Sequence, residues 1–181
     1  MASDWVDDPV FNVRHRFSPK GSALQVESEA PPGGGVLLEH FHPTTKETFE
    51  VVEGEFTFTA NGEERVAGPS EEVVVEPGVR HTFENTGQGV GRVSCLAEPP
   101  LELQGFLEET AALARAGKYT KRGIPKGLGA ALEAAEIIER YRDTVVLTGG
   151  LFPPPAVQPA LLKPIARIQR WRKGRTDPAA G

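Results

Sequence analysis

The first hundred residues alternate apolar and polar side chains with the period of two that is typical of β-strands. Strong turn signals separate the alternating segments, among them Pro31-Pro32-Gly33-Gly34-Gly35, Asn61-Gly62 and Pro77-Gly78. The Asn61-Gly62 dipeptide lies between two β-prone segments and predicts a hairpin. Many short strands with turns between them favour an antiparallel sandwich or barrel. The predicted strands lie within residues 20–30, 36–42, 47–53, 55–59, 73–75, 80–85 and 92–96.

The pattern changes to a helical period near Pro99-Pro100. Apolar residues then recur at helical spacing, and we expect helices over 101–116, 128–142 and 160–173. Pro164 falls in the first turn of the last helix or kinks it. The sequence therefore predicts a mainly β domain over 1–100 and a C-terminal helical extension over 101–181. We expect the extension to pack on the barrel or on a second subunit.

Composition narrows the class of protein. The chain has 181 residues, of which 39% are hydrophobic and 25% charged, an ordinary balance for a folded domain. Residues 1–100 carry 7 Lys and Arg against 17 Asp and Glu, a charge of −10, and residues 101–181 carry 13 against 8, a charge of +5. The acidic half argues against nucleic acid as a partner. The single cysteine excludes an intrachain disulfide.

The segment that begins the chain has no signal-peptide pattern, and no apolar stretch is long enough to cross a bilayer. From these features we expect a cytoplasmic protein without a membrane span.

Three of the four histidines lie in predicted strands and could form a metal site. His40 and His42 point the same way because residues two apart on a strand share a face. Glu47 can return to the same pocket on the next strand, after a link of four residues, and His81 could add a third imidazole. Three imidazoles and one carboxylate suit a divalent transition metal: Mn, Fe, Co, Ni, Cu or Zn. The bland alternative for a His-x-His pair alone is surface polarity.

The spacing of these residues resembles the two motifs of the cupin superfamily. The first segment reads Gly34-x5-His40-x-His42-x4-Glu47-x6-Gly54, and the second reads Pro77-Gly78-x2-His81-x3-Asn85. The resemblance covers roughly residues 25–97 and implies a cupin-type jelly-roll β-barrel with one metal inside. By position it implies that the metal ligands are His40, His42, Glu47 and His81. It also implies turns at Gly54 and Gly78, a structural role for Asn85, and a homodimer.

The second motif departs from the family pattern. Eight residues separate Gly68 from Pro77, more than is usual, and Glu76 stands where a proline is expected. We interpret this as an insertion around residues 69–72 that lengthens a turn and leaves His81 in place.

Strand parity suggests which residues would line the pocket. The predicted substrate-binding residues are Leu38, Phe49, Val51, Phe83 and Arg92, with Val36, Phe56 and Phe58 as further apolar neighbours. An aromatic residue on a barrel strand is, however, usually part of the ordinary core. Because Arg80 alternates away from His81, Arg92 is the best candidate for gripping a substrate carboxylate. The apolar lining favours a small, mostly apolar or aromatic substrate over a sugar phosphate.

Two classes of function remain open. The first is a metal-dependent small-molecule enzyme of dioxygenase, isomerase, decarboxylase or lyase type, in which Glu47 is both ligand and catalytic base. The oxygenase version leads, and a cyclase or dehydratase is a weaker variant. The second is a non-catalytic small-molecule-binding module. Fold alone does not choose between them.

Two other features have simpler interpretations. Cys95 could be a nucleophile, but a lone cysteine on a strand is usually a small buried apolar residue. The last predicted helix is basic and amphipathic, and we interpret its apolar face as packing rather than membrane binding. Its cations are Lys163, Arg167, Arg170, Arg172 and Lys173, with Arg175 just beyond.

Overall fold

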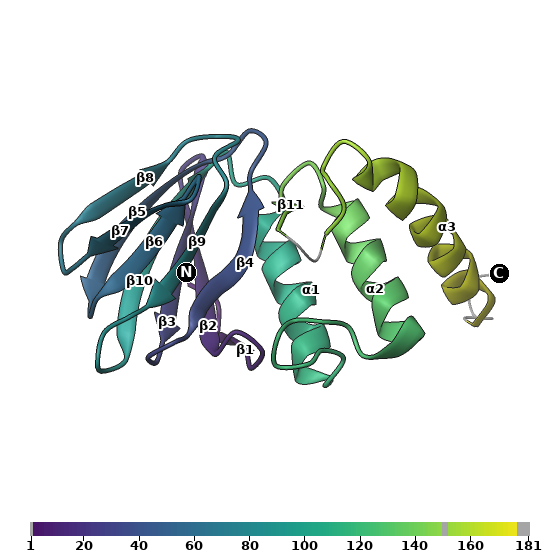
Figure 1. The fold of residues 1–181 in the computed structure, drawn as a ribbon, viewed down its shortest axis with the longest axis horizontal. Coiled ribbons are helices and arrows are strands. Elements are labelled where there is room, and N and C mark those ends of the chain that lie inside the picture. The colour runs from purple at the N-terminus through teal and green to yellow at the C-terminus, as the bar shows by residue number, and fades with distance from the viewer. Residues whose placement is uncertain (1, 150–151, 177–181) are drawn as a thin grey trace.

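Two antiparallel sheets face each other and form the barrel (Figure 1). The computed structural model describes residues 2–149 and 152–176. The first sheet has six strands in the order β1-β2-β3-β10-β5-β8. Its strands are β1 (Val6–Asp8), β2 (Val13–Lys20), β3 (Ala23–Ala30), β5 (Lys46–Glu53), β8 (Glu72–Val75) and β10 (Gly91–Glu98).

The second sheet has five strands in the order β11-β4-β9-β6-β7. These are β4 (Gly35–Phe41), β6 (Phe56–Ala60), β7 (Glu63–Ala67), β9 (His81–Asn85) and β11 (Val146–Leu147). Asn61 and Gly62 both have positive φ, 50° and 84°, and join β6 to β7 as a two-residue loop. This confirms the predicted hairpin, since such turns need two residues that tolerate left-handed backbone.

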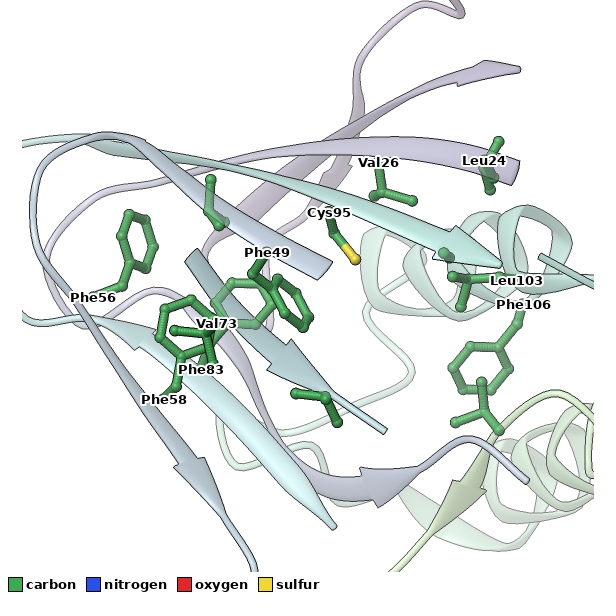
Figure 2. Close-up of a cluster of buried hydrophobic side chains, with 14 of the residues drawn as sticks. Leu24, Val26, Phe49, Phe56, Phe58, Val73, Phe83, Cys95, Leu103 and Phe106 are labelled. Carbon is green, nitrogen blue, oxygen red and sulfur yellow. The ribbon is translucent and has the colours of Figure 1, made fainter. Parts of the chain in front are cut away.

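An aromatic cluster fills the part of the barrel away from the helices (Figure 2). The ring of Phe49 lies 5.3 Å from that of Phe58 and 5.6 Å from that of Phe83, centroid to centroid. Phe56 packs beside them and is fully buried. Alternate residues of facing strands point inward, so this packing follows directly from the period-two pattern.

Three helices follow the barrel: α1 (Leu103–Arg115), α2 (Gly127–Arg140) and α3 (Gln158–Thr176). Their bounds confirm the three predicted helices to within a few residues, and Pro164 lies inside α3. Leu103 and Phe106 of α1 join the hydrophobic core of the barrel, and the ring of Phe106 lies 5.8 Å from that of Tyr141. Helix α3 packs on α2 and lies farthest from the sheets (Figure 1). No helix in the described part of the chain is both long and apolar enough to cross a membrane.

Several local features differ from the sequence expectations. Strands β1 and β2 precede the first predicted strand, and residues 20–30 contain the turn between β2 and β3. The insertion expected around residues 69–72 lies at a tight turn over 68–71, in which the Gly68 amide donates to the Glu71 carboxylate at 2.7 Å. That turn is hydrogen-bonded to Val51 of β5, and His81 lies on β9 as expected.

The helical extension also contributes a strand. Residues Val146 and Leu147 pair with Phe41 and His40 of β4, so residues beyond 100 complete an edge of the second sheet. The expectation of two separate parts that meet at residue 100 therefore stays a prediction. Of the basic residues in α3, the side chains of Arg170, Arg172, Lys173 and Arg175 lie outside the described residues.

Candidate metal centre

Four buried side chains converge inside the barrel. His40 lies on β4 and pairs directly with His81 of β9, while His42 follows one residue after β4 ends. Glu47 faces them from β5 in the opposite sheet, after the link over residues 43–46. Each residue offers one ligand atom, and these atoms all lie within 4.8 Å of one another. We call these four residues the His/Glu cluster.

Backbone carbonyls fix the orientation of all three imidazoles. The Nδ1 atom of His40 lies 2.8 Å from the Leu38 carbonyl oxygen, and that of His81 lies 3.0 Å from the Val79 carbonyl oxygen. The Nδ1 atom of His42 lies 2.8 Å from the carbonyl oxygen of Thr144. A carbonyl oxygen only accepts hydrogen bonds, so each Nδ1 carries the proton. In the neutral rings each Nε2 therefore presents a lone pair.

The two oxygens of Glu47 have different surroundings. Oε1 accepts a hydrogen bond from the Cys95 thiol, with Sγ at 3.6 Å. Oε2 lies 2.9 Å from Nε2 of His81 and 3.3 Å from Nε2 of His42. Burial, and then the charge of Glu47, raise the pKa of the Cys95 thiol well above its usual value, so it stays protonated and donates.

The electrostatics of the metal-free cluster favour one proton on His42. Burial would lower the pKa of His42, but the Glu47 carboxylate outweighs it and raises that pKa. Burial would likewise raise the pKa of Glu47, but the histidines, His42 first, hold it well below its usual value. Burial, aided by His81 and His42, lowers the pKa of His40 well below 6.5. His42 and Glu47 thus each favour the charged form of the other in the metal-free protein.

The cluster fits a cation. Within the described residues, His42 Nε2, His81 Nε2 and Glu47 Oε2 are fully buried and have no well-formed hydrogen bond. Buried polar atoms rarely stay unsatisfied, and in the neutral rings two imidazole lone pairs and a carboxylate oxygen have no donor among them. Imidazole nitrogens and one carboxylate oxygen are donors that first-row divalent metals accept. The donor set and its orphaned atoms together match one such ion.

A cavity of about 150 Å³ lies against the His/Glu cluster. Its walls come from both sheets, from α1 and α2, and from the segments that connect the helices. Leu103 and Phe106 close it on the side of α1, where Figure 2 shows them at the open end of the barrel. Its lining is mostly apolar, and no Lys or Arg of the described residues contributes to it.

The predicted pocket residues divide into two groups. Leu38, Phe49 and Phe83 line the cavity together with the cluster. Val51 is completely buried in the core but does not line it. The structure does not bring Arg92 to the cavity either: its side chain is about half exposed on the outer face of β10, 3.2 Å from Glu53. Val93 and Cys95 occupy the inward positions of that strand, which leaves the outward face for Arg92.

Sequence reasoning missed three contributors to the site. Thr144 orients His42 through a backbone carbonyl, which has no signature in the sequence. Cys95 contacts Glu47, although its interpretation as a small buried residue is otherwise correct. His15 lines the same cavity from β2, where the alternation of Val13, His15 and Phe17 with arginines could have revealed an inward face.

Comparisons with known proteins agree with the barrel. Residues 26–97 match the family model described as "Cupin domain". An oxidoreductase of Arthrobotrys oligospora is 35% identical over 78 residues, which are 42% of this chain and 27% of that protein. The chain thus spans about a quarter of the length of that relative.

Two solved structures are among those to which the chain is similar. KdgF from a Halomonas species is 17% identical, with a TM-score of 0.49, over 56% of this chain and 91% of that one. An RmlC-like cupin from Shewanella frigidimarina is 20% identical, also with a TM-score of 0.49, over 56% of this chain and 87% of that one.

Proposed function

Residues 26–97 of this chain are a cupin domain, and from that premise we propose that the His/Glu cluster binds one divalent transition metal and that the adjoining cavity binds a small molecule. We propose further that the protein acts on this molecule as a metal-dependent enzyme. The single observation that carries the proposal is the convergence of four buried ligand atoms within 4.8 Å of one another. Of these residues, His42, His81 and Glu47 each present a buried atom without a well-formed hydrogen bond.

The preorganisation of the cluster supports tight metal binding. Each imidazole is already held in the orientation that directs Nε2 inward, by the carbonyls of Leu38, Thr144 and Val79. Such outer partners fix the tautomer and ring angle of a metal-binding histidine. The Cys95 thiol engages one oxygen of Glu47 and leaves the other directed at the histidines. His40, His42, Glu47 and His81 would hold the metal with these anchors already in place.

The cavity favours a neutral and mostly apolar ligand. A cavity of about 150 Å³ suits a molecule near the size of benzene, the kind of guest that apolar cavities of this volume accept. No Lys or Arg among its described lining residues is available to pair with a carboxylate or phosphate. The substrate would instead lie against apolar side chains such as Leu38, Phe49 and Phe83.

The bound ion would supply Lewis-acid polarisation of a ligand oxygen, or redox chemistry if it is Fe, Mn or Cu. The protein's own residues would position the ligand and exclude water. Glu47 would hold the metal and is the carboxylate nearest to a ligand beside it, so we also assign it the role of proton acceptor. The oxygenase version remains the leading one. The Arthrobotrys relative, whose match covers 42% of this chain, is named an oxidoreductase, and this name favours that version.

A non-catalytic binding module is the second candidate. The observation that favours it is the closure of the cavity by α1 and α2, which suits retention of a ligand. The two functions differ in one experiment: the metal-loaded protein, incubated with a bound ligand under oxygen and under argon, either converts the ligand or returns it unchanged. The homodimer and the cytoplasmic location expected from the sequence stay predictions, and sedimentation velocity would test the first.

Metal analysis tests the central proposal. Protein purified without a chelator or a His tag should contain about one transition-metal ion per chain by mass spectrometry of the metals. His42→Ala and Glu47→Gln should lose most of it while keeping a cooperative thermal transition. His15→Phe is the matched control, because it replaces a buried histidine of the same cavity outside the cluster. Protein that binds no stoichiometric metal, even after reconstitution at neutral pH, would refute the proposal.

A further inference from the structure

His15 is a buried histidine that belongs to the cavity but not to the His/Glu cluster. It lies on β2, is 3% exposed, and lines the cavity. When the strand pairing is followed from β5 through β10 and β3 to β2, the residue of β2 that lies in the same row as Glu47 is Pro19. Pro19 is four residues from His15. His15 is therefore two inward positions farther along the sheet from Glu47, with two strands between β2 and β5. It faces another part of the cavity and is not a fifth ligand.

Only one nitrogen of His15 has a protein partner. Its Nδ1 lies 2.9 Å from the hydroxyl of Ser28, the residue opposite it on β3. In the described part of the chain Nε2 has no hydrogen-bond partner, although the ring is almost completely buried. A polar atom in that position requires a partner from within the cavity.

The Ser28 hydroxyl determines what Nε2 can offer. Among the described residues the hydroxyl contacts no acceptor other than His15 Nδ1, and a buried hydroxyl proton needs one. The arrangement that satisfies both groups has the Ser28 O–H donating to Nδ1, which puts the ring proton on Nε2. Because burial lowers the pKa of His15 to about 4, the ring is neutral at pH 7. It presents an uncharged N–H donor rather than a cation.

A tyrosine hydroxyl is a second potential hydrogen-bond donor at this cavity. Tyr119, in the segment after α1, is half-buried, and its hydroxyl has no hydrogen bond to any described residue. Burial, then Asp8 and Glu133, raise its pKa to about 12, so it too stays a neutral donor. By contrast, the Thr110 hydroxyl at the same cavity already donates to the Phe106 carbonyl at 2.8 Å.

We propose that His15 Nε2 donates a hydrogen bond to an oxygen atom of a neutral, monocyclic ligand in this cavity, so that the ligand class is an aromatic or cyclic carbonyl compound or alcohol. The identification of this ligand with the substrate rests on the proposed function, whereas its binding at His15 does not. Among the described lining residues no Lys or Arg stands beside His15 to pair with an anion, and a pure hydrocarbon would leave Nε2 unsatisfied.

Two probes of similar shape isolate the hydrogen bond. Acetophenone carries a carbonyl acceptor, whereas ethylbenzene does not, and both match the cavity in size. The dissociation constants of both are measured by NMR titration with the wild-type chain, His15→Phe and Thr110→Val. Comparing the ratio of the two constants between proteins removes any change in apolar contact that affects both probes equally. One neutral hydrogen bond predicts a preference for acetophenone that falls about threefold to tenfold in His15→Phe. Thr110→Val, whose hydroxyl is already engaged, should keep the wild-type ratio.

A ratio that is the same in His15→Phe and the wild type would overturn the proposal, as would binding of neither probe to the wild type. If His15→Phe does not fold, the ring nitrogens of His15 in the wild type decide the matter: a long-range ¹H–¹⁵N spectrum must show the proton on Nε2, and a proton on Nδ1 refutes the argument. Both measurements are made on protein from which metal has been removed. Metal content is determined on a separate, untreated portion of the same preparation. Failure of the His/Glu cluster to bind metal and failure of His15 to bind the carbonyl are thereby distinguished.

Discussion

The neutral state of buried His15 predicts how the stability of the protein depends on pH. In the folded chain burial holds the pKa of His15 at about 4, against 6.5 for an exposed histidine. Below pH 6.5 the unfolded chain therefore binds a proton that the folded chain excludes. Unfolding becomes more favourable as the pH falls from 6.5 towards 4, and the stability linked to His15 is complete only above pH 6.5.

The magnitude follows from the two pKa values. Between pH 7 and pH 4.5 the linkage removes roughly 2.4 kcal/mol from the free energy of unfolding. His15→Phe has no such proton, so its unfolding free energy should fall less over this interval by about that amount. Urea unfolding of both proteins, in the metal-free state at pH 7 and pH 4.5, measures the difference. Other titrating groups contribute to both proteins and cancel where they do not contact residue 15.

A parallel decline in the two proteins would refute the reasoning, because it would show that His15 is protonated or solvated in the folded state. The measurement is independent of any loss of packing caused by the substitution. Such a loss shifts the stability of His15→Phe equally at both pH values.

Substitutions at two further positions test the structural support of the site. Asn85→Ala should cost about 3 kcal/mol in urea unfolding, because Asn85 is fully buried and its side chain makes hydrogen bonds to Ala30, Gly87 and Gly89; a cost below about 1 kcal/mol would contradict the structural role. Cys95→Ala should weaken metal binding several-fold in competition with a chelating dye by freeing one oxygen of Glu47, and Cys95→Ser should restore it through a hydroxyl donor. Equal affinities in all three proteins would show that the thiol contact has no effect on Glu47.

The cluster was predictable because its spacing is local. His40 and His42 share a face by strand parity alone, and Glu47 needs only a short link to reach the facing sheet. The structure brings these residues together with His81, as the motif spacing indicates. The antiparallel strands and the three helices followed from periodicity and turn residues, whereas the choice of a barrel over a sandwich came from the resemblance to the cupin motifs.

The outer partners were not predictable because they depend on long-range backbone contacts. The carbonyl that orients His42 lies 102 residues away, at Thr144. Every residue carries a carbonyl, so no side-chain pattern marks the one that is used. The strand of Val146 and Leu147 is too short for periodicity to show and exists because β4 offers it an edge. Arg92 differs: the inward alternation of Val93 and Cys95 was visible in the sequence and places it outside.

The His/Glu cluster and the far wall of the cavity come from different parts of the chain. The cupin domain over residues 26–97 contains the whole His/Glu cluster on its strands and the link that follows β4, so the proposed metal chemistry depends on the part that the family shares. The far wall of the cavity comes from α1 and α2, through apolar side chains such as Leu107, Ile137 and Ile138, which lie outside that match. His15 also lies outside it, on β2. The cavity wall determines which ligand shape and polarity fit. The substrate of a cupin relative therefore cannot be assigned to this chain from the shared domain alone. Substitutions in α1 or α2 should change which ligand binds, whereas substitutions in the cluster should change whether a metal is held.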